Sequence, residues 1–269
     1  MIGAQTLNMV KSIDLNSDLG EGFGVYKCGD DEAMLSVVTS ANVACGFHAG
    51  DPMIMARTFQ LAKERGVAVG AHPGFPDLPG FGRRRIPYSP GEIERIVAYQ
   101  IGAAQALAAY CGHRITHVKP HGALANAAEV EYEVAGAIAR AIRSVDPTLS
   151  FLAIALGEQV NAAERAGINA YIEIFADRGY TKEGRLVPRG TPGALIEDPE
   201  EAAERVLTMV DAGAIITVEG TRLKTPIDSV CVHGDSPGAV QTAQRVRARL
   251  EAAGVVVAAF SSRSPQVSG

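Results

Sequence analysis

Short stretches in which apolar and polar residues alternate recur along the chain, separated by longer amphipathic stretches. Alternation with a period of two predicts β-strands, and apolar residues spaced three or four apart predict helices. We predict strands over 12–18, 41–48, 67–72, 115–121, 150–155, 170–177, 229–235 and 255–260. The predicted helices lie near 30–39, 51–65, 90–111, 128–143, 157–166, 198–212 and 237–253.

This regular alternation of strand and helix indicates a parallel sheet, in either a closed barrel or an open doubly wound arrangement. Two segments, 178–197 and 214–228, interrupt it, and we expect them to be long loops or hairpins that either border the site or only decorate the rim. No shift in composition marks a boundary, so we predict one domain over 1–269 with flexible tails at 1–11 and 261–269.

Polar side chains gather on one side of several predicted strands. This one-sided pattern distinguishes a closed barrel from an open doubly wound sheet. In the first strand, Asp14, Asn16 and Asp18 share one side and Ile13 and Leu15 the other. Later strands repeat this pattern. Strand by strand, their polar side carries Asn42 and His48; His72; His117, Lys119 and His121; Glu173 and Asp177; and His233 and Asp235. A barrel explains the pattern best, because its inner faces converge on one axis. We therefore predict a (β/α) barrel of seven or eight mostly parallel strands, with its site at the C-terminal mouth.

Composition narrows the class of protein. The formal net charge of −5 argues against a general nucleic-acid binder. The four cysteines form no CxxC pair, so we expect free thiols in a reducing cytoplasm rather than disulfides or a cysteine zinc site. The N-terminus lacks the apolar core of a signal peptide, and no apolar run is long enough to cross a bilayer. A cytoplasmic enzyme without nucleic-acid or membrane partners fits these observations.

Several motifs then resemble one known family. They are DLNSDLGEGFG (14–24), SANVACGFHAGDP (40–52), GAHPGFPD (70–77), GFGRR (80–84), HVKPHGAL (117–124), FADRGY (175–180) and VHGD (232–235). Together they resemble the LamB/YcsF family, whose members are known as the A subunit of 5-oxoprolinase, over residues 12–260. The resemblance implies a seven-stranded (β/α) barrel related to sugar and amide deacetylases. It also implies ATP-dependent opening of 5-oxoproline (pyroglutamate) to glutamate, with B and C partner subunits. Ala125 departs from the family, which usually has tyrosine at that position.

The chain has no GxxxxGK[ST] phosphate loop, and the glycines of GEGFG (20–24) lack the lysine and the spacing of one. We therefore expect partner subunits to use ATP to activate the lactam, and this barrel to complete the ring opening. Two other functions stay open at this point. One is a stand-alone metal-dependent amidase or deacetylase, and the other is a non-catalytic subunit that binds a small carboxylic acid.

Catalytic roles can be assigned from side-chain chemistry. Asp14, Asp18 or His72 is the candidate general base. Lys119 and His121 are candidates for stabilising negative charge on a tetrahedral oxygen or a phosphorylated intermediate. His233, followed by Asp235, is the candidate proton donor to the leaving nitrogen. His117 lies deeper in its strand, so we expect a structural role for it, as for His113.

The remaining polar residues suit binding. Arg83, Arg84 or Arg178 is the candidate clamp for the substrate carboxylate. The other candidate substrate-binding or orienting residues are Asn16, Asn42, His48, Glu173 and Asp177. Asp18, His48 and His72, with His121 as a further candidate, are ligand types that suit zinc or another divalent ion. The alternative is a metal-free polar network.

Overall fold

Seven parallel strands close into a barrel, because the last of them, β9, pairs with both β6 and β1. The computed structural model describes residues 11–236 and 238–262. The barrel strands are β1 (Ser12–Leu19), β2 (Ser40–Ala44), β3 (Ala68–His72), β4 (Ile115–Val118), β5 (Ser150–Ile154), β6 (Ala170–Phe175) and β9 (Ser229–Cys231). The predicted barrel is confirmed, and the doubly wound alternative is wrong.

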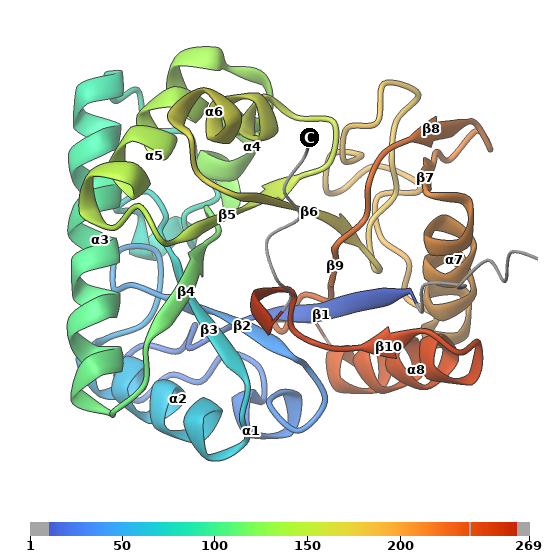
Figure 1. Cartoon of the computed structure of the whole chain (residues 1–269), viewed down its shortest axis with the longest axis horizontal. Coiled ribbons are helices and arrows are strands. Elements are labelled where there is room, and N and C mark those ends of the chain that lie inside the picture. The colour runs from blue at the N-terminus through green and yellow to red at the C-terminus, as the bar shows by residue number, and fades with distance from the viewer. Residues whose placement is uncertain (1–10, 237, 263–269) are drawn as a thin grey trace, which may run out of the picture.

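Helices surround the strands (Figure 1). They are α1 (Asp31–Met34), α2 (Pro52–Glu64), α3 (Pro90–Tyr110), α4 (Gly122–Val130), α5 (Tyr132–Val145), α6 (Glu158–Ala166), α7 (Pro199–Ala212) and α8 (Ala239–Ala252). Three of them begin with proline after a capping side chain that accepts backbone N–H groups: Asp51, Ser89 and Asp198. No helix among residues 11–236 and 238–262 combines the length and apolar character needed to cross a bilayer.

Several strands are shorter than the alternation predicted. β2 ends at Ala44, and Gly46 then adopts a left-handed φ of 89°, so His48 lies on a loop rather than on the strand. β4 ends before Pro120, which has no N–H to donate. The N–H of His121 still donates to the carbonyl of Pro73 (2.8 Å), so the alternation of side chains continues to His121.

The regions between strands differ from the prediction in two places. The single helix predicted over 128–143 is two helices, α4 and α5, separated at Glu131, whose ψ of 110° breaks the helix. α4 begins at Gly122, before the predicted range, and contains four alanines, the residue with the highest helix propensity. Only residues 31–34 of the predicted 30–39 are α-helical.

The two interrupting segments are loops or hairpins, as predicted. Residues 214–228 contain an antiparallel hairpin of β7 (Ala214–Ile216) and β8 (Arg222–Lys224). In 178–197, Arg178 forms a bridge with Leu195 and Tyr180 with Leu186.

The C-terminal segment closes the N-terminal end of the barrel. The strand predicted over 255–260 is reduced to β10 (Val256–Val257), which pairs with the start of β1. The ring of Phe260, in the short 3-10 helix η2 (Phe260–Ser262), then lies 4.5 Å from the ring of Tyr171 and 5.0 Å from that of His117. Most of each predicted tail, residues 1–10 and 263–269, lies outside the described residues.

Replacing Gly70 with alanine is expected to lower the free energy of unfolding by about 1–3 kcal/mol. A Cβ at this position would overlap the ring of His117, which is hydrogen-bonded to Asn42 and cannot move freely. Chemical denaturation measures the loss. Gly102→Ala in α3 is the control: nothing lies within 4 Å of its new Cβ, so stability should stay or rise by up to about 1 kcal/mol. Equal changes in the free energy of unfolding for Gly70→Ala and Gly102→Ala would contradict this packing.

Candidate active site

The inward side chains of β1 begin a polar column inside the barrel. Asp14 is at its deepest point, fully buried, and accepts hydrogen bonds from Thr39 (2.7 Å), Ser40 (2.6 Å) and Ser229. These hydroxyls surround the carboxylate, and Asp14 is not among the residues that line the cavity at the barrel mouth. The structure therefore places this candidate base beneath the site.

Amide side chains form the next layer. Asn42 donates to Asn16 Oδ1 (2.8 Å) and to Asp18 Oδ1 (2.9 Å), and its own oxygen accepts from His117 Nε2 (2.8 Å). Burial, with the charge of Lys119, lowers the pKa of His117 to about 3. His117 is thus a neutral donor in a buried network, and Asn16 and Asn42 orient the layer above.

Lys119 is the centre of that upper layer. Its ammonium lies 2.9 Å from Asp18 Oδ1, 3.1 Å from Glu173 Oε2 and 3.1 Å from Cys231 Sγ. Burial by itself lowers the pKa of Lys119, but Asp18, Cys231 and Glu173 outweigh it, so that pKa lies well above its usual value. Burial likewise opposes ionisation of Asp18, yet the Lys119 ammonium helps to hold its pKa well below its usual range. The result is a buried ion pair at the base of the mouth.

A cavity of about 480 Å³ opens above this pair. Its charged and polar lining residues are Asp18, His72, Arg83, Lys119, His121, Asn126, Glu129, Glu173, Arg178, Arg189 and His233. The barrel therefore brings together eight of the predicted site residues. A larger cavity of about 660 Å³ lies between the loop after β1 and α2, but its lining contains no histidine and none of the predicted site residues.

His233 faces the cavity and is held by a carboxylate from the neighbouring strand. Its Nδ1 lies 2.9 Å and 3.0 Å from the two oxygens of Asp177, so the Nδ1–H donates to Asp177 and leaves Nε2 for the cavity. Asp235, the other candidate residue of this segment, has a different partner. Asp235 instead accepts from Arg83 at 2.6 Å, because the rim loop after β3 reaches it.

The three candidate arginines differ in their position relative to the cavity and in their partners. Arg178 is buried, and its Nε and Nη2 donate to the carbonyls of Ala194 (3.1 Å) and Val187 (2.7 Å), which fixes the guanidinium at the cavity wall. Arg83 also lines the cavity but is paired with Asp235. Arg84 bonds Asp77 with both Nε and Nη2, and its side chain is 67% exposed, so it lies outside the cavity.

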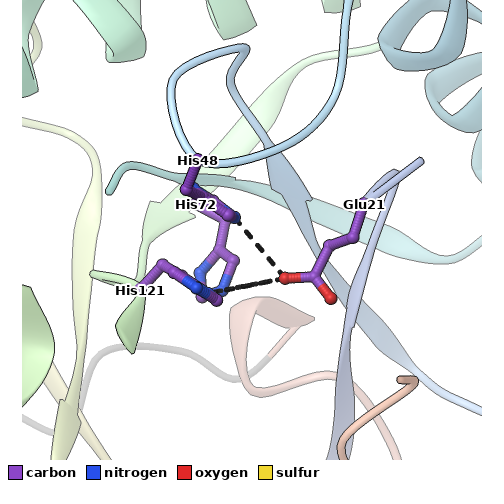
Figure 2. A group of neighbouring side chains, drawn as sticks. All are labelled: Glu21, His48, His72 and His121. Carbon is purple, nitrogen blue, oxygen red and sulfur yellow. Dashed lines mark hydrogen bonds and ion pairs between the residues drawn. The ribbon is translucent and has the colours of Figure 1, made fainter. Parts of the chain in front are cut away.

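Three histidines and a glutamate form a second group beside the cavity (Figure 2). We name Glu21, His48, His72 and His121 the histidine cluster. Glu21 Oε1 lies 3.5 Å from His48 Nε2, 3.4 Å from His121 Nδ1 and 4.0 Å from His72 Nε2. All four residues are buried.

The cluster differs from the predicted ligand set of Asp18, His48 and His72. Asp18 lies beside it, with Oδ2 3.4 Å from His72 Nε2, but its other oxygen is bound to Lys119. Sequence reasoning missed Glu21, although the residue stands in the quoted DLGEGFG motif. An acidic residue just past a strand of inward carboxylates was the available signal.

Known proteins that are similar to this chain agree on one family. The sequence profile of the LamB/YcsF family matches residues 13–265. The chain belongs to the LamB/YcsF family. A LamB/YcsF relative from Azorhizobium caulinodans, named as the A subunit of 5-oxoprolinase, is 64% identical over 250 residues, covering 93% of this chain and 99% of the relative. Another of that name, from Mycolicibacterium paratuberculosis, is 55% identical over 248 residues, covering 92% and 98%.

A solved LamB/YcsF-like structure supports the fold assignment. The crystal structure of a lactam utilization protein from Thermus thermophilus superposes with a TM-score of 0.88 at 45% identity, covering 93% of this chain and 100% of that one. Ala125, where the resemblance predicts a departure from the family pattern, lines the cavity.

Proposed function

We propose that this chain is the A subunit of an ATP-dependent 5-oxoprolinase, which hydrolyses the lactam of 5-oxo-L-proline to L-glutamate. Full-length similarity to proteins named as the A subunit of 5-oxoprolinase carries the proposal. A lactam utilization protein with the same barrel supports the class of substrate. The name of these relatives also supports a complex, and we assign its other members as the B and C subunits.

The chemistry of the substrate is the basis for assigning some steps to the partner subunits and others to this chain. A five-membered lactam is a stable amide, so its hydrolysis needs coupling to ATP. This chain carries no phosphate-loop motif. We assign ATP-dependent activation of the lactam oxygen to the partner subunits, and the steps that follow to this barrel.

In the ring-opening step, water loses a proton and forms a bond to the lactam carbonyl carbon, the carbon–nitrogen bond breaks, and the nitrogen takes up a proton. The phosphoryl group that activated the lactam oxygen leaves as inorganic phosphate. His233 is our candidate donor of that proton, because Asp177 holds its Nδ1 and leaves Nε2 toward the cavity. Lys119 is our candidate for stabilising the developing negative charge. Its ammonium lines the cavity, and one of its contacts there is with the Cys231 thiol, a weak acceptor.

Asp18 is our candidate for orienting the attacking water. Of the candidate bases, Asp14 is enclosed by hydroxyls and lies beneath the cavity. Asp18 lines the cavity, and Lys119 and Asn42 both hold its Oδ1, so Oδ2 is the oxygen left for water.

Arg178→Lys is expected to raise KM for 5-oxoproline at least about 10-fold with a smaller change in kcat, because a lysine cannot make the bidentate contact that a guanidinium makes with a carboxylate. Arg178 suits this role because carbonyl groups already fix its orientation at the cavity. Steady-state kinetics of the reconstituted complex measures the effect. Arg84→Lys is the matched control and should leave KM unchanged, because Arg84 pairs with Asp77 outside the cavity.

Reconstitution tests the proposal as a whole. The purified chain is given 5-oxoproline and ATP, with and without the B and C subunits, and glutamate is measured. Glutamate is expected only with all three subunits and ATP. No glutamate under that condition, with all subunits folded, would reject the proposal. Hydrolysis of an N-acyl substrate by this chain alone would favour the stand-alone amidase.

A further inference from the structure

In two histidines of the cluster, a backbone carbonyl group determines which ring nitrogen carries the proton. His72 Nδ1 lies 2.7 Å from the carbonyl oxygen of Lys119, and His121 Nε2 lies 2.8 Å from that of Phe81. A carbonyl oxygen only accepts, so each of these nitrogens carries the N–H. The other two nitrogens, His72 Nε2 and His121 Nδ1, then carry lone pairs in the neutral rings, and they lie only 3.0 Å apart. Facing lone pairs at that distance require a cation between or beside them.

The rest of the cluster is also short of partners. Among the described residues, Glu21 Oε1 and both ring nitrogens of His48 are buried without a hydrogen bond. Each such atom costs about 1–3 kcal/mol. A proton shared between His72 and His121 would satisfy those two rings and leave Glu21 and His48 unsatisfied. A single cation that all four side chains contact would provide a partner for Glu21, His72 and His121 and for one of the two ring nitrogens of His48.

The distances fit a transition-metal ion. Ligands bound at the usual 2.0–2.2 Å in a tetrahedral arrangement lie about 3.4 Å from one another. The donor atoms here are separated by 3.0 Å between His72 and His121, and by 3.4–4.0 Å from Glu21 Oε1 to the three rings. The N–H to carbonyl bonds of His72 and His121 are the contacts that usually orient metal-bound imidazoles.

Packing, rather than hydrogen bonding, places the ring of His48. It stacks on the ring of His121 at 3.7 Å and has no hydrogen bond that fixes it. Two glycines border it: a Cβ at Gly74 would lie 2.6 Å from His48 Nδ1, and one at Gly82 would lie 2.7 Å from its Cβ. Side chains at either glycine would fill the space that the ring needs.

We propose that Glu21, His48, His72 and His121 bind one divalent first-row transition-metal ion of the zinc class. Three imidazoles favour such an ion over Mg²⁺ or Ca²⁺, which prefer oxygen ligands. The neighbouring group of Asp18, Cys231 and His233 is not the site, because the Lys119 ammonium already lies against Asp18 and Cys231. Since His72 and His121 also line the cavity, the ion would supply Lewis-acid chemistry at the wall of the proposed ring-opening site.

Metal content and spectroscopy test the proposal without any substrate. The untagged full-length chain is stripped with EDTA, loaded with Zn²⁺ or Co²⁺, desalted, and measured by elemental analysis, visible absorption and thermal unfolding. We expect about one ion per chain, a Co²⁺ ligand-field spectrum, and a rise in the unfolding midpoint with Zn²⁺.

Glu21→Gln and His48→Gln keep the side-chain size and should each weaken metal affinity more than about 10-fold, with loss of the midpoint rise. His113→Gln is the matched control, because His113 bonds the carbonyl of Val67 away from the cluster, and it should bind as the wild type does. A wild-type chain that holds no ion, or cluster variants that bind as His113→Gln does, would overturn the assignment. Because no substrate is present, this result is independent of whether the complex forms glutamate.

Discussion

Replacing Lys119 with methionine is expected to lower the free energy of unfolding by about 3–5 kcal/mol, the usual cost of removing one partner of a buried ion pair. The side chain of Lys119 is 4% exposed and lies between Asp18 and Glu173. Methionine fills similar space, so the loss comes from leaving two buried carboxyl groups without their cation rather than from a cavity. Urea denaturation monitored by circular dichroism measures the change.

Two further variants show whether charge is the cause. Lys182→Met removes a lysine that is 69% exposed, and its effect should stay within about 0.5 kcal/mol. Adding Asp18→Asn to Lys119→Met should recover part of the stability, giving a coupling energy above about 1 kcal/mol. If Lys119→Met and Lys182→Met lower the free energy of unfolding by the same amount, the buried pair does not stabilise the barrel.

Asp177→Asn is expected to lower kcat of the reconstituted complex roughly 10²–10⁴-fold. Asp177 is a positioning residue: it accepts the Nδ1–H of His233 and so fixes which ring nitrogen faces the cavity. An asparagine can present its NH₂ group instead, which favours the other tautomer and takes away the correctly placed proton carrier. KM should change little, since the substrate carboxylate is assigned to Arg178.

The control for this variant is Asp235→Asn. Asp235 lies two residues after His233 in the sequence and pairs with Arg83 at the rim, so kcat should fall less than about 10-fold. Comparing the two variants at saturating 5-oxoproline and ATP separates the alternatives. A larger loss for Asp235→Asn than for Asp177→Asn would mean that His233 changes its partner in the working complex.

The inward-facing residues of the strands were predictable because the alternation of a strand fixes the side of every second residue. Asp14, Asn16 and Asp18 followed from one rule, and their burial in a shared network agrees with it. The same rule carried through Lys119 to His121.

Residues beyond the strand ends were not predictable in this way. Glu21 follows Gly20, whose φ of 69° ends the alternation of β1. His48 reaches its place on a loop after Gly46, so its position depends on a turn rather than on a strand face. Whether His233 pairs with Asp177 or with Asp235 depends on the spacing of two neighbouring strands at the rim. Such distances follow from barrel closure, which no local pattern contains.

The same closure has a consequence for how the chain reaches its folded state. β1, near the start of the chain, pairs with β9 and β10 near its end. Phe260 then packs against Tyr171 and His117 beneath the site. Contacts of such high sequence separation slow folding. A nascent chain therefore cannot close the barrel until β9 has been synthesised, and it cannot cover the N-terminal end until residues near 260 have followed. Until then, β1 lacks both late partners and its polar column is open to water, a stage at which chaperones would find an exposed strand edge.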